Sequence, residues 1–142
     1  MDPITTAIRI LTYAGLIPLL VLNCLCLLVG LTPWDQWLIN YTAIIISFIA
    51  GMQWGISLEL ERSIWVLLLS IFGSLWGWFT LLFNTVITSL ILQIIGMIFL
   101  YVIDTKLIPE DAYPVQYLVT RRRATGFFIT FLIIQILIQL YH

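Results

Sequence analysis

Two groups of charged side chains could bind an anionic ligand or act on one. They are Glu59, Glu61, Arg62, Arg121, Arg122 and Arg123. Guanidinium groups bind phosphate and carboxylate oxygens with directed hydrogen bonds, and a nearby carboxylate can orient such a ligand. The pattern allows docking of a partner subunit or an anionic ligand, or phosphate-headgroup chemistry that depends on Glu59 or Glu61 and Arg121. The alternative is a solvated cluster that enforces topology and attracts anionic lipid headgroups.

Side chains suited to metal binding or nucleophilic catalysis are scarce. The single histidine is the last residue, His142, so neither a Ser-His-Asp triad nor a haem site is expected. Cys24 and Cys26 would point about 200° apart on a helix and cannot share a tetrahedral metal site by themselves, so we interpret them as packing residues. The sequence also has no glycine-rich phosphate loop. We therefore expect a protein that is not an enzyme and that holds no metal or cofactor.

The composition is that of a membrane protein. Of the 142 residues, 62% are hydrophobic and 9% are charged, whereas soluble domains have roughly 45 to 50% apolar and about 25% charged residues. The net charge of −1 gives no basic field for nucleic acid. We expect membrane lipids and other membrane-protein subunits as partners.

Helix length sets the number of membrane spans. A helix of about 20 residues crosses the hydrocarbon core, so the uncharged stretch 63–103 is long enough for two spans with a turn near Asn84 and Thr85. The sequence then predicts an all-α polytopic bundle, a single integral membrane domain over residues 1–142. Its five transmembrane helices are expected at about 9–29, 38–56, 64–83, 86–103 and 125–141, with an inner loop over 104–124.

Orientation follows from the basic residues, which favour the cytoplasmic or matrix side. With the N-terminus inside, all six Lys and Arg residues fall on the inner side, which places the C-terminus outside. These spans contain no ionisable side chain. Ion-coupled transporters usually carry such groups inside the membrane, so we expect no pumping or ion-coupled transport by this chain.

Small residues recur along two of the expected helices. Close backbone contact between small residues drives helix association in lipid. The two ridges pack against each other within this bundle, or one of them receives the helix of a partner protein. The helix-packing residues expected are Ala43, Ser47, Gly51 and Gly55 on one helix and Ser70, Gly73, Ser74 and Gly77 on the next.

A polar notch is expected in the first span. Pro18 removes a backbone hydrogen bond and favours a kink, and Asn23 lies further along a similar face. Together with Gln53 and Trp54 these residues could line a ligand pocket. The simpler interpretation of Pro18 is a kink that serves packing.

Three segments of the chain resemble a known family. The run from Tyr41 to Gly55 resembles the signature helix of a family of small membrane proteins that includes transmembrane protein 69. The segment from Pro114 through Tyr117 to Arg121 resembles that family's second signature, and residues 15–18 are similar too. The resemblance covers essentially the whole chain. Many members have Gly where Ala50 stands.

Many members also have His where Gln53 stands, and the loss of that His weakens any inherited metal or proton site. The family occurs in bacteria and mitochondria without a characterised activity, so the resemblance implies a fold and a location only.

Two functions are therefore predicted. The first is a non-catalytic accessory or assembly subunit that packs against a larger complex of an energy-transducing, respiratory-type membrane. The alternative is a small carrier or binding protein for a lipid, a quinone or an uncharged solute. The expected location is the bacterial inner (cytoplasmic) membrane, because no transit segment rich in Arg and Ser is recognisable. The mitochondrial inner membrane is the alternative.

Overall fold

The computed structural model describes residues 3–60, 64–114 and 116–142, and this part of the chain contains helices and no strand. Five of its helical segments are long and apolar enough to cross a membrane, as the sequence predicted. The helices are α1 (Pro3–Ala14), α2 (Ile17–Leu28), α3 (Trp34–Leu60), α4 (Ile64–Phe79), α5 (Val86–Lys106) and α6 (Tyr117–Tyr141). Two short 3-10 turns, η1 (Thr80–Leu82) and η2 (Glu110–Ala112), complete the set.

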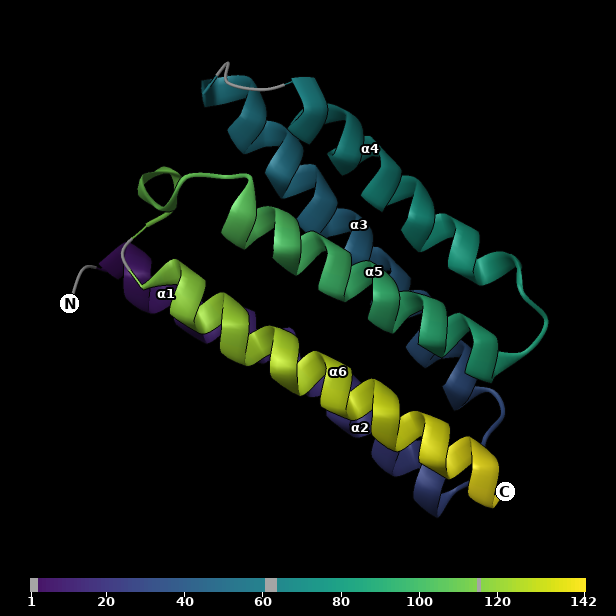
Figure 1. Cartoon of the computed structure of the whole chain (residues 1–142). Helices are drawn as coiled ribbons and strands as arrows, with labels where there is room; N and C mark the ends of the chain where they lie inside the picture. The colour runs from purple at the N-terminus through teal and green to yellow at the C-terminus, as the bar shows by residue number, and fades with distance from the viewer. Residues whose placement is uncertain (1–2, 61–63, 115) are drawn as a thin grey trace.

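The helices lie side by side as one bundle (Figure 1). Helices α1 and α2 together form the first span, and both run along α6. Helix α3 packs against α2, α4 and α5, and α5 also contacts α6. The N-terminus and the connection between α5 and α6 lie at one end of the bundle, and the C-terminus lies at the other (Figure 1). We call the first of these the N-terminal end.

The first span is broken between Ala14 and Ile17, where α1 ends and α2 begins. Pro18 stands in the first turn of α2, where its missing N–H costs little. The Tyr41 hydroxyl on α3 donates a hydrogen bond to the Gly15 carbonyl oxygen at 2.7 Å. A broken helix is tolerated in lipid where a neighbour satisfies the freed backbone groups in this way. After the break, α2 packs against α3 as well as α6.

Small residues hold α3 and α4 together. A Cβ atom added to Gly77 would lie 2.6 Å from the Ser47 Oγ and 2.9 Å from the Ala43 carbonyl oxygen. The Ser47 hydroxyl donates to the Ser74 carbonyl oxygen at 3.1 Å, and the Ser74 hydroxyl donates back to the Ser47 carbonyl oxygen at 3.4 Å. Half of the expected ridge on α3 therefore faces the expected ridge on α4.

The remaining small residues are divided between the interior and the surface. Gly73 faces Ala50 and the side chain of Leu100, and Ser70 is buried with its hydroxyl bound to a carbonyl oxygen of its own helix. Gly51 and Gly55 are exposed, and a Cβ atom added to either would have no neighbour within 4 Å. That half of the α3 ridge is open within the described structure.

An amide ties α5 to α3 and to η1. The fully buried Gln93 donates through Nε2 to the Ile39 carbonyl oxygen at 3.0 Å and to the Thr80 Oγ1 at 3.2 Å. Its Oε1 accepts a hydrogen bond from the Thr42 hydroxyl. Both ends of the amide are thus satisfied inside the membrane-spanning part of the bundle.

The connection between α5 and α6 is shorter than the sequence suggested. Helix α5 continues to Lys106, and α6 already begins at Tyr117, so residues 107–116 replace the expected loop 104–124. The expected helix boundaries were set at the first charged residue on each side. Asp104 is instead neutralised inside the bundle by Arg121, and both helices extend past these two residues.

Candidate functional site

A buried ion pair joins α5 to α6. The Arg121 Nε donates to the Asp104 Oδ2 at 2.9 Å, and the two side chains are 6% and 0% exposed. Both residues lie inside helices that are long enough to span the membrane. This corrects the expectation that no span contains an ionisable side chain, because that expectation placed Asp104 and Arg121 in a loop.

Two further donors complete the surroundings of the Asp104 carboxylate. Its Oδ1 accepts hydrogen bonds from the Gln53 Nε2 at 2.9 Å and from the Tyr113 hydroxyl at 2.5 Å. The same Gln53 nitrogen also donates to the Leu100 carbonyl oxygen at 2.8 Å. Since α3, α5, α6 and the connection before α6 each contribute one group, this network fixes the N-terminal end of the bundle.

Tyr113 is a neutral donor in this network. Burial of the phenol, followed by the nearby Asp104 carboxylate, raises the pKa of Tyr113 far above its ordinary value. An ionised phenol would place a second negative charge beside Asp104 in a poorly solvated site. Tyr113 therefore keeps its proton throughout the physiological pH range and continues to donate it to Asp104.

Arg121 has poorer partners on its other side. Its Nη1 donates to the Thr125 Oγ1 at 2.7 Å and to the Met97 sulfur at 3.6 Å. Its Nη2 donates to the same Met97 sulfur, also at 3.6 Å. A thioether sulfur is a weak acceptor, so Nη2 is bound less well than Nε and Nη1, which both have oxygen acceptors.

A cavity of about 600 Å³ lies beside the ion pair, and Arg121 forms part of its wall. Helices α1, α3 and α6 supply most of the lining, and the rest comes from Met97 and from the connection before α6. Most lining side chains are apolar. Helix α1 packs against α6, while α2 packs against both α3 and α6. Gly15 and Leu16 also line the cavity, so the break in the first span lies at its edge.

The cavity opens towards the side of the bundle. Leu11 on α1 and Phe48 on α3 both line it, yet they are 70% and 72% exposed. In a membrane-spanning bundle such exposed apolar side chains face lipid. An amphipathic molecule could therefore reach the cavity from within the bilayer, between α1 and α3.

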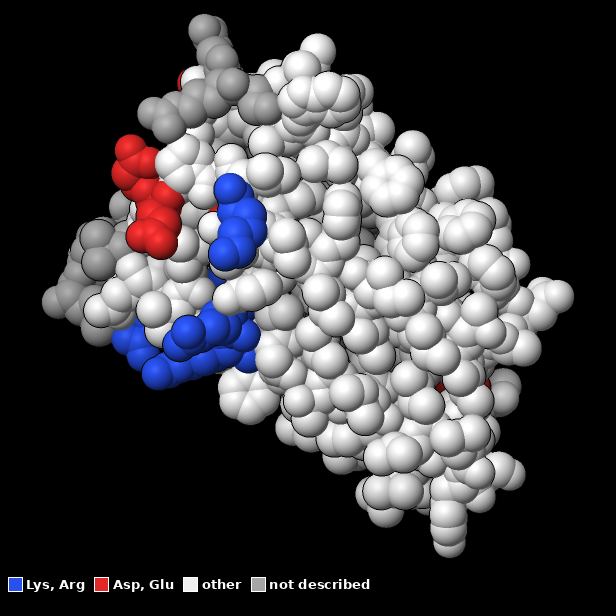
Figure 2. Space-filling view, viewed as in Figure 1, with Lys and Arg blue, Asp and Glu red and all other residues white. Residues whose placement is uncertain are grey.

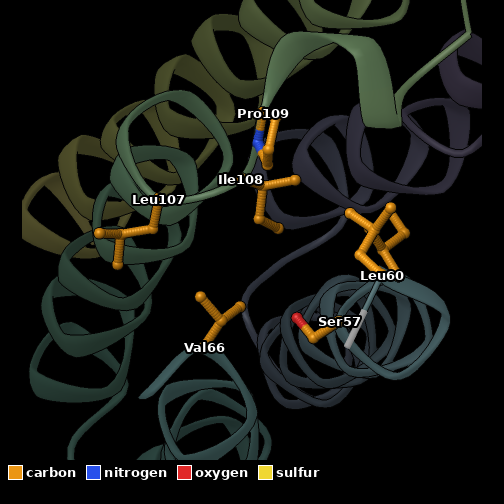
Figure 3. Close-up of a pocket in the computed structure, with 7 residues that line it drawn as sticks. Ser57, Leu60, Val66, Leu107, Ile108 and Pro109 are labelled. Carbon is orange, nitrogen blue, oxygen red and sulfur yellow. The ribbon is translucent and has the colours of Figure 1, made fainter. Parts of the chain in front are cut away.

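A second, much smaller cavity lies where the end of α3, the start of α4 and the connection after α5 meet (Figure 3). Its volume is about 20 Å³, which is enough for about one water molecule. Among the described residues, Ser57 is the one polar side chain in its lining, and its hydroxyl donates to the Gln53 carbonyl oxygen at 2.8 Å. This cavity is too small for an organic ligand.

The four residues expected at a ligand pocket are not among those that line the large cavity. Pro18 is in the first turn of α2, and Asn23 is buried and donates to the Leu19 carbonyl oxygen of its own helix at 2.9 Å. Gln53 belongs to the Asp104 network, and Trp54 is 37% exposed. The structure therefore brings Gln53, but not the other three, to the candidate site.

The charged residues expected at the inner face are separated by the fold. Arg121 is buried in the ion pair, whereas Arg122, Arg123 and Glu59 are exposed. Glu61 and Arg62 lie outside the described residues. Charged side chains gather at the N-terminal end of the molecule, and most of the remaining surface in this view is uncharged (Figure 2).

Sequence reasoning missed Asp104, Tyr113 and Met97 as members of the site. One signal was present: Asp104 follows a long uncharged stretch directly, and Arg121 begins the next basic run. Reading both residues as helical would have suggested an ion pair. The positions of Tyr113 and Met97 depend on how the connection folds back, and no sequence spacing predicts that.

The comparisons with known proteins identify a family without an activity. Residues 4–137 match the family described as "Protein of unknown function (DUF3429)". Neither the curated proteins nor the solved structures contain a match. Because the match spans most of the 142 residues, the chain belongs to this family of proteins of unknown function.

Proposed function

We propose that the protein is a non-catalytic integral membrane protein that binds a lipid, a quinone or another uncharged solute in the cavity between α1, α3 and α6. The observation that carries this proposal is the cavity itself, about 600 Å³ in volume, with mostly apolar walls and Arg121 in its lining. Ligand sites are typically concave and mostly apolar, with a few placed polar groups, and measure roughly 300 to 1,000 Å³. The lateral opening supports a ligand that arrives through the bilayer.

Filling the cavity tests this proposal. Ala124 on α6 lines the cavity, so Ala124→Phe would occupy part of its volume. Gly126 on the same helix has open space around it and does not line the cavity, so Gly126→Phe is the matched control. The full chain would be purified in mild detergent, and bound lipids and quinones would be extracted and quantified by mass spectrometry. We expect a stoichiometric ligand with the wild type and Gly126→Phe, and its loss with Ala124→Phe.

A second filling variant guards against misfolding. Ile45→Trp would fill the cavity from α3, and helix content by circular dichroism would show which variants are folded. Equal amounts of ligand on wild type, Ala124→Phe and Ile45→Trp, all folded, would refute the proposal.

A second candidate function is that of an accessory or assembly subunit of a larger complex in an energy-transducing membrane. It is favoured by Gly51 and Gly55, which leave an exposed strip of small residues on α3 with no atom within 4 Å of an added Cβ. A close-packed partner helix needs such a strip. Phe48 and Leu58, both exposed, flank the strip and would extend the contact.

The double variant Gly51→Leu and Gly55→Leu tests this second function. Because both positions are open, the isolated protein should fold normally, whereas a partner helix could no longer approach. Gly126→Leu, which is equally open on α6, is the control. Co-purification of the same membrane proteins with all three chains would argue strongly against the subunit hypothesis.

We further propose that the N-terminal end faces the cytoplasm or, in a mitochondrion, the matrix. Among the described residues, Lys106 and Arg121 to Arg123 flank the connection at that end, and Arg9 lies in α1. The positive-inside rule supports this orientation. We likewise propose that the protein is related to transmembrane protein 69 and lies in a bacterial inner membrane, with the mitochondrial inner membrane as the alternative. Labelling of His142→Cys in a chain lacking Cys24 and Cys26 by an impermeant maleimide from outside intact cells would test the orientation, and protection of that cysteine would refute it.

A further inference from the structure

The polar side chains that line the large cavity fall into two classes by their hydrogen-bond acceptors. Thr12 and Tyr41 donate to backbone carbonyl oxygens at 2.6 and 2.7 Å, and Tyr113 donates to the Asp104 carboxylate. Arg121 binds oxygen through its Nε and Nη1, but its Nη2 and the Tyr117 hydroxyl are directed to sulfur. The Tyr117 hydroxyl donates to the Met52 sulfur at 3.4 Å, and the Arg121 Nη2 donates to the Met97 sulfur.

These two donors are available to a ligand. A thioether is a weak acceptor, and burying a donor without a good acceptor is unfavourable. A ligand oxygen that replaced either sulfur would therefore improve an existing hydrogen bond without breaking a strong one. Lining donors that already bind oxygen, such as Tyr41, would gain nothing from the exchange.

The charge of the site selects against an anionic ligand. The Arg121 guanidinium is neutralised by Asp104 at 2.9 Å, and the carboxylate has two additional donors in Gln53 and Tyr113. Apart from the tyrosines and Arg121, the cavity lining contains no ionisable side chain among the described residues. A charged headgroup would be desolvated beside an ion pair that is already compensated, which is costly.

Resting on the binding function proposed above, we propose that Tyr117 and Arg121 recognise an uncharged headgroup with carbonyl oxygens, carried on an apolar body that fills the rest of the cavity. A quinone and a neutral glycerol ester both have this chemistry. The exposed arginines Arg122 and Arg123 would then contribute to orientation in the membrane and not to recognition of this ligand.

Direct binding of three probes tests the headgroup. Decylubiquinone, dioleoylglycerol and the anion oleate would be titrated against the full chain in detergent micelles, with equilibrium gel filtration of radiolabelled probe as the measurement. We expect saturable binding of at least one neutral probe and weaker binding of oleate. The neutral probe with the higher affinity identifies whether the source is a quinone or a neutral lipid.

Two substitutions with opposite expected signs test the recognising groups. Tyr117→Phe removes a hydroxyl whose present acceptor is sulfur, so the fold should be retained while affinity for the neutral probe falls about fivefold. Met52→Leu is nearly isosteric and releases the Tyr117 hydroxyl from its sulfur acceptor, so affinity should rise. Tyr101→Phe, at a tyrosine on α5 that does not line the cavity, is the matched control and should bind as the wild type.

The outcomes separate the headgroup assignment from the binding function. Tighter binding of oleate than of both neutral probes, or an unchanged affinity in Tyr117→Phe while Ala124→Phe abolishes binding, would overturn the assignment and leave the binding function standing. Neutral probes that bind Ala124→Phe as tightly as the wild type would overturn both.

Discussion

The Asp104 Oδ2 atom on α5 accepts a hydrogen bond from the Arg121 Nε atom on α6 at 2.9 Å, and both side chains are almost completely buried. This contact does two things at once. It neutralises a carboxylate inside a membrane-spanning helix, and it holds the guanidinium at the wall of the large cavity. The stability of the bundle and the chemistry of the cavity therefore depend on the same pair.

Removing one member of the pair should be costly. Arg121→Met leaves Asp104 buried without its cation, and breaking a buried ion pair in this way costs about 3 to 5 kcal/mol. Arg122→Met is the matched control because Arg122 is exposed, and surface substitutions usually change stability by less than about 0.5 kcal/mol. Unfolding by titration with sodium dodecyl sulfate, followed by circular dichroism, would measure the difference.

The double variant Asp104→Asn and Arg121→Met separates charge from packing. It leaves no uncompensated charge, so we expect it to recover most of the stability that Arg121→Met loses. A double variant no more stable than Arg121→Met would show that the cost comes from packing and not from the unpaired carboxylate.

Alkaline pH should weaken the contact between Tyr113 and Asp104. In the unfolded chain the phenol ionises near pH 10, whereas burial raises the pKa of Tyr113 in the folded protein. The folded state therefore holds its proton more tightly. The stabilisation is complete below pH 10 and is lost as the pH rises from 10 through the higher folded-state pKa.

Tyr113→Phe isolates that effect from the other tyrosines. Below pH 9 the variant should be less stable by about 1.5 to 3 kcal/mol, the usual contribution of a hydrogen bond to a charged group. The gap should narrow above pH 10, because only the wild type carries the titrating phenol. Denaturant unfolding at pH 8 and at pH 11 gives both values, and a gap that widens with pH would contradict the interpretation.

Two buried glutamines offer a comparison of satisfied and unsatisfied amides. Gln93 and Gln135 are both fully buried. Gln93 has partners on α3 and η1 through both ends of its amide. Neither end of the Gln135 amide makes a hydrogen bond of normal geometry among the described residues, and its interaction is with the Cys26 thiol, a weak hydrogen-bonding group.

Replacement by leucine should therefore act in opposite directions. Gln93→Leu removes interhelical hydrogen bonds, each worth about 0.6 kcal/mol in a membrane protein, and leaves the Ile39 carbonyl oxygen with one partner fewer. Gln135→Leu removes a buried amide whose interaction is with the weakly bonding Cys26 thiol, and it should be neutral or stabilising. Equal losses of thermal stability in the two variants would show that Gln135 is satisfied in the folded protein.

The number of spans could be predicted because it depends on hydropathy and length. The turn at Asn84 and Thr85 falls between η1 and α5, as expected from the length of the uncharged stretch. The helix ends near Asp104 and Arg121 could not be placed in the same way. A sequence window treats each charge as a boundary, whereas the fold brings these two charges together and lets both helices continue.

The large cavity was beyond the reach of sequence reasoning for a related reason. Most of its lining comes from α1, α3, α6 and a connection, so it depends on how segments far apart in the sequence meet. The break near Pro18 was foreseeable from the proline. The effect of that break, a cavity lined by Gly15 and Tyr41 rather than by Asn23 and Trp54, depends on the different packing partners of α1 and α2.

Two glycines test the contact between α3 and α4. Gly77 on α4 approaches the Ala43 carbonyl oxygen so closely that an added Cβ atom would lie 2.9 Å from it, whereas Gly51 on α3 has open space. Backbone atoms cannot move aside as a flexible side chain can, so Gly77→Ala must push the two helices apart. We expect the free energy of unfolding to fall by about 1 to 3 kcal/mol, as for other overpacked sites.

The control variant Gly51→Ala should be neutral or stabilising by up to about 1 kcal/mol, because alanine favours a helix more than glycine does. Thermal unfolding of both variants in the same detergent would measure these shifts, and a Gly77→Ala protein as stable as Gly51→Ala would mean that α3 and α4 do not pack through Gly77.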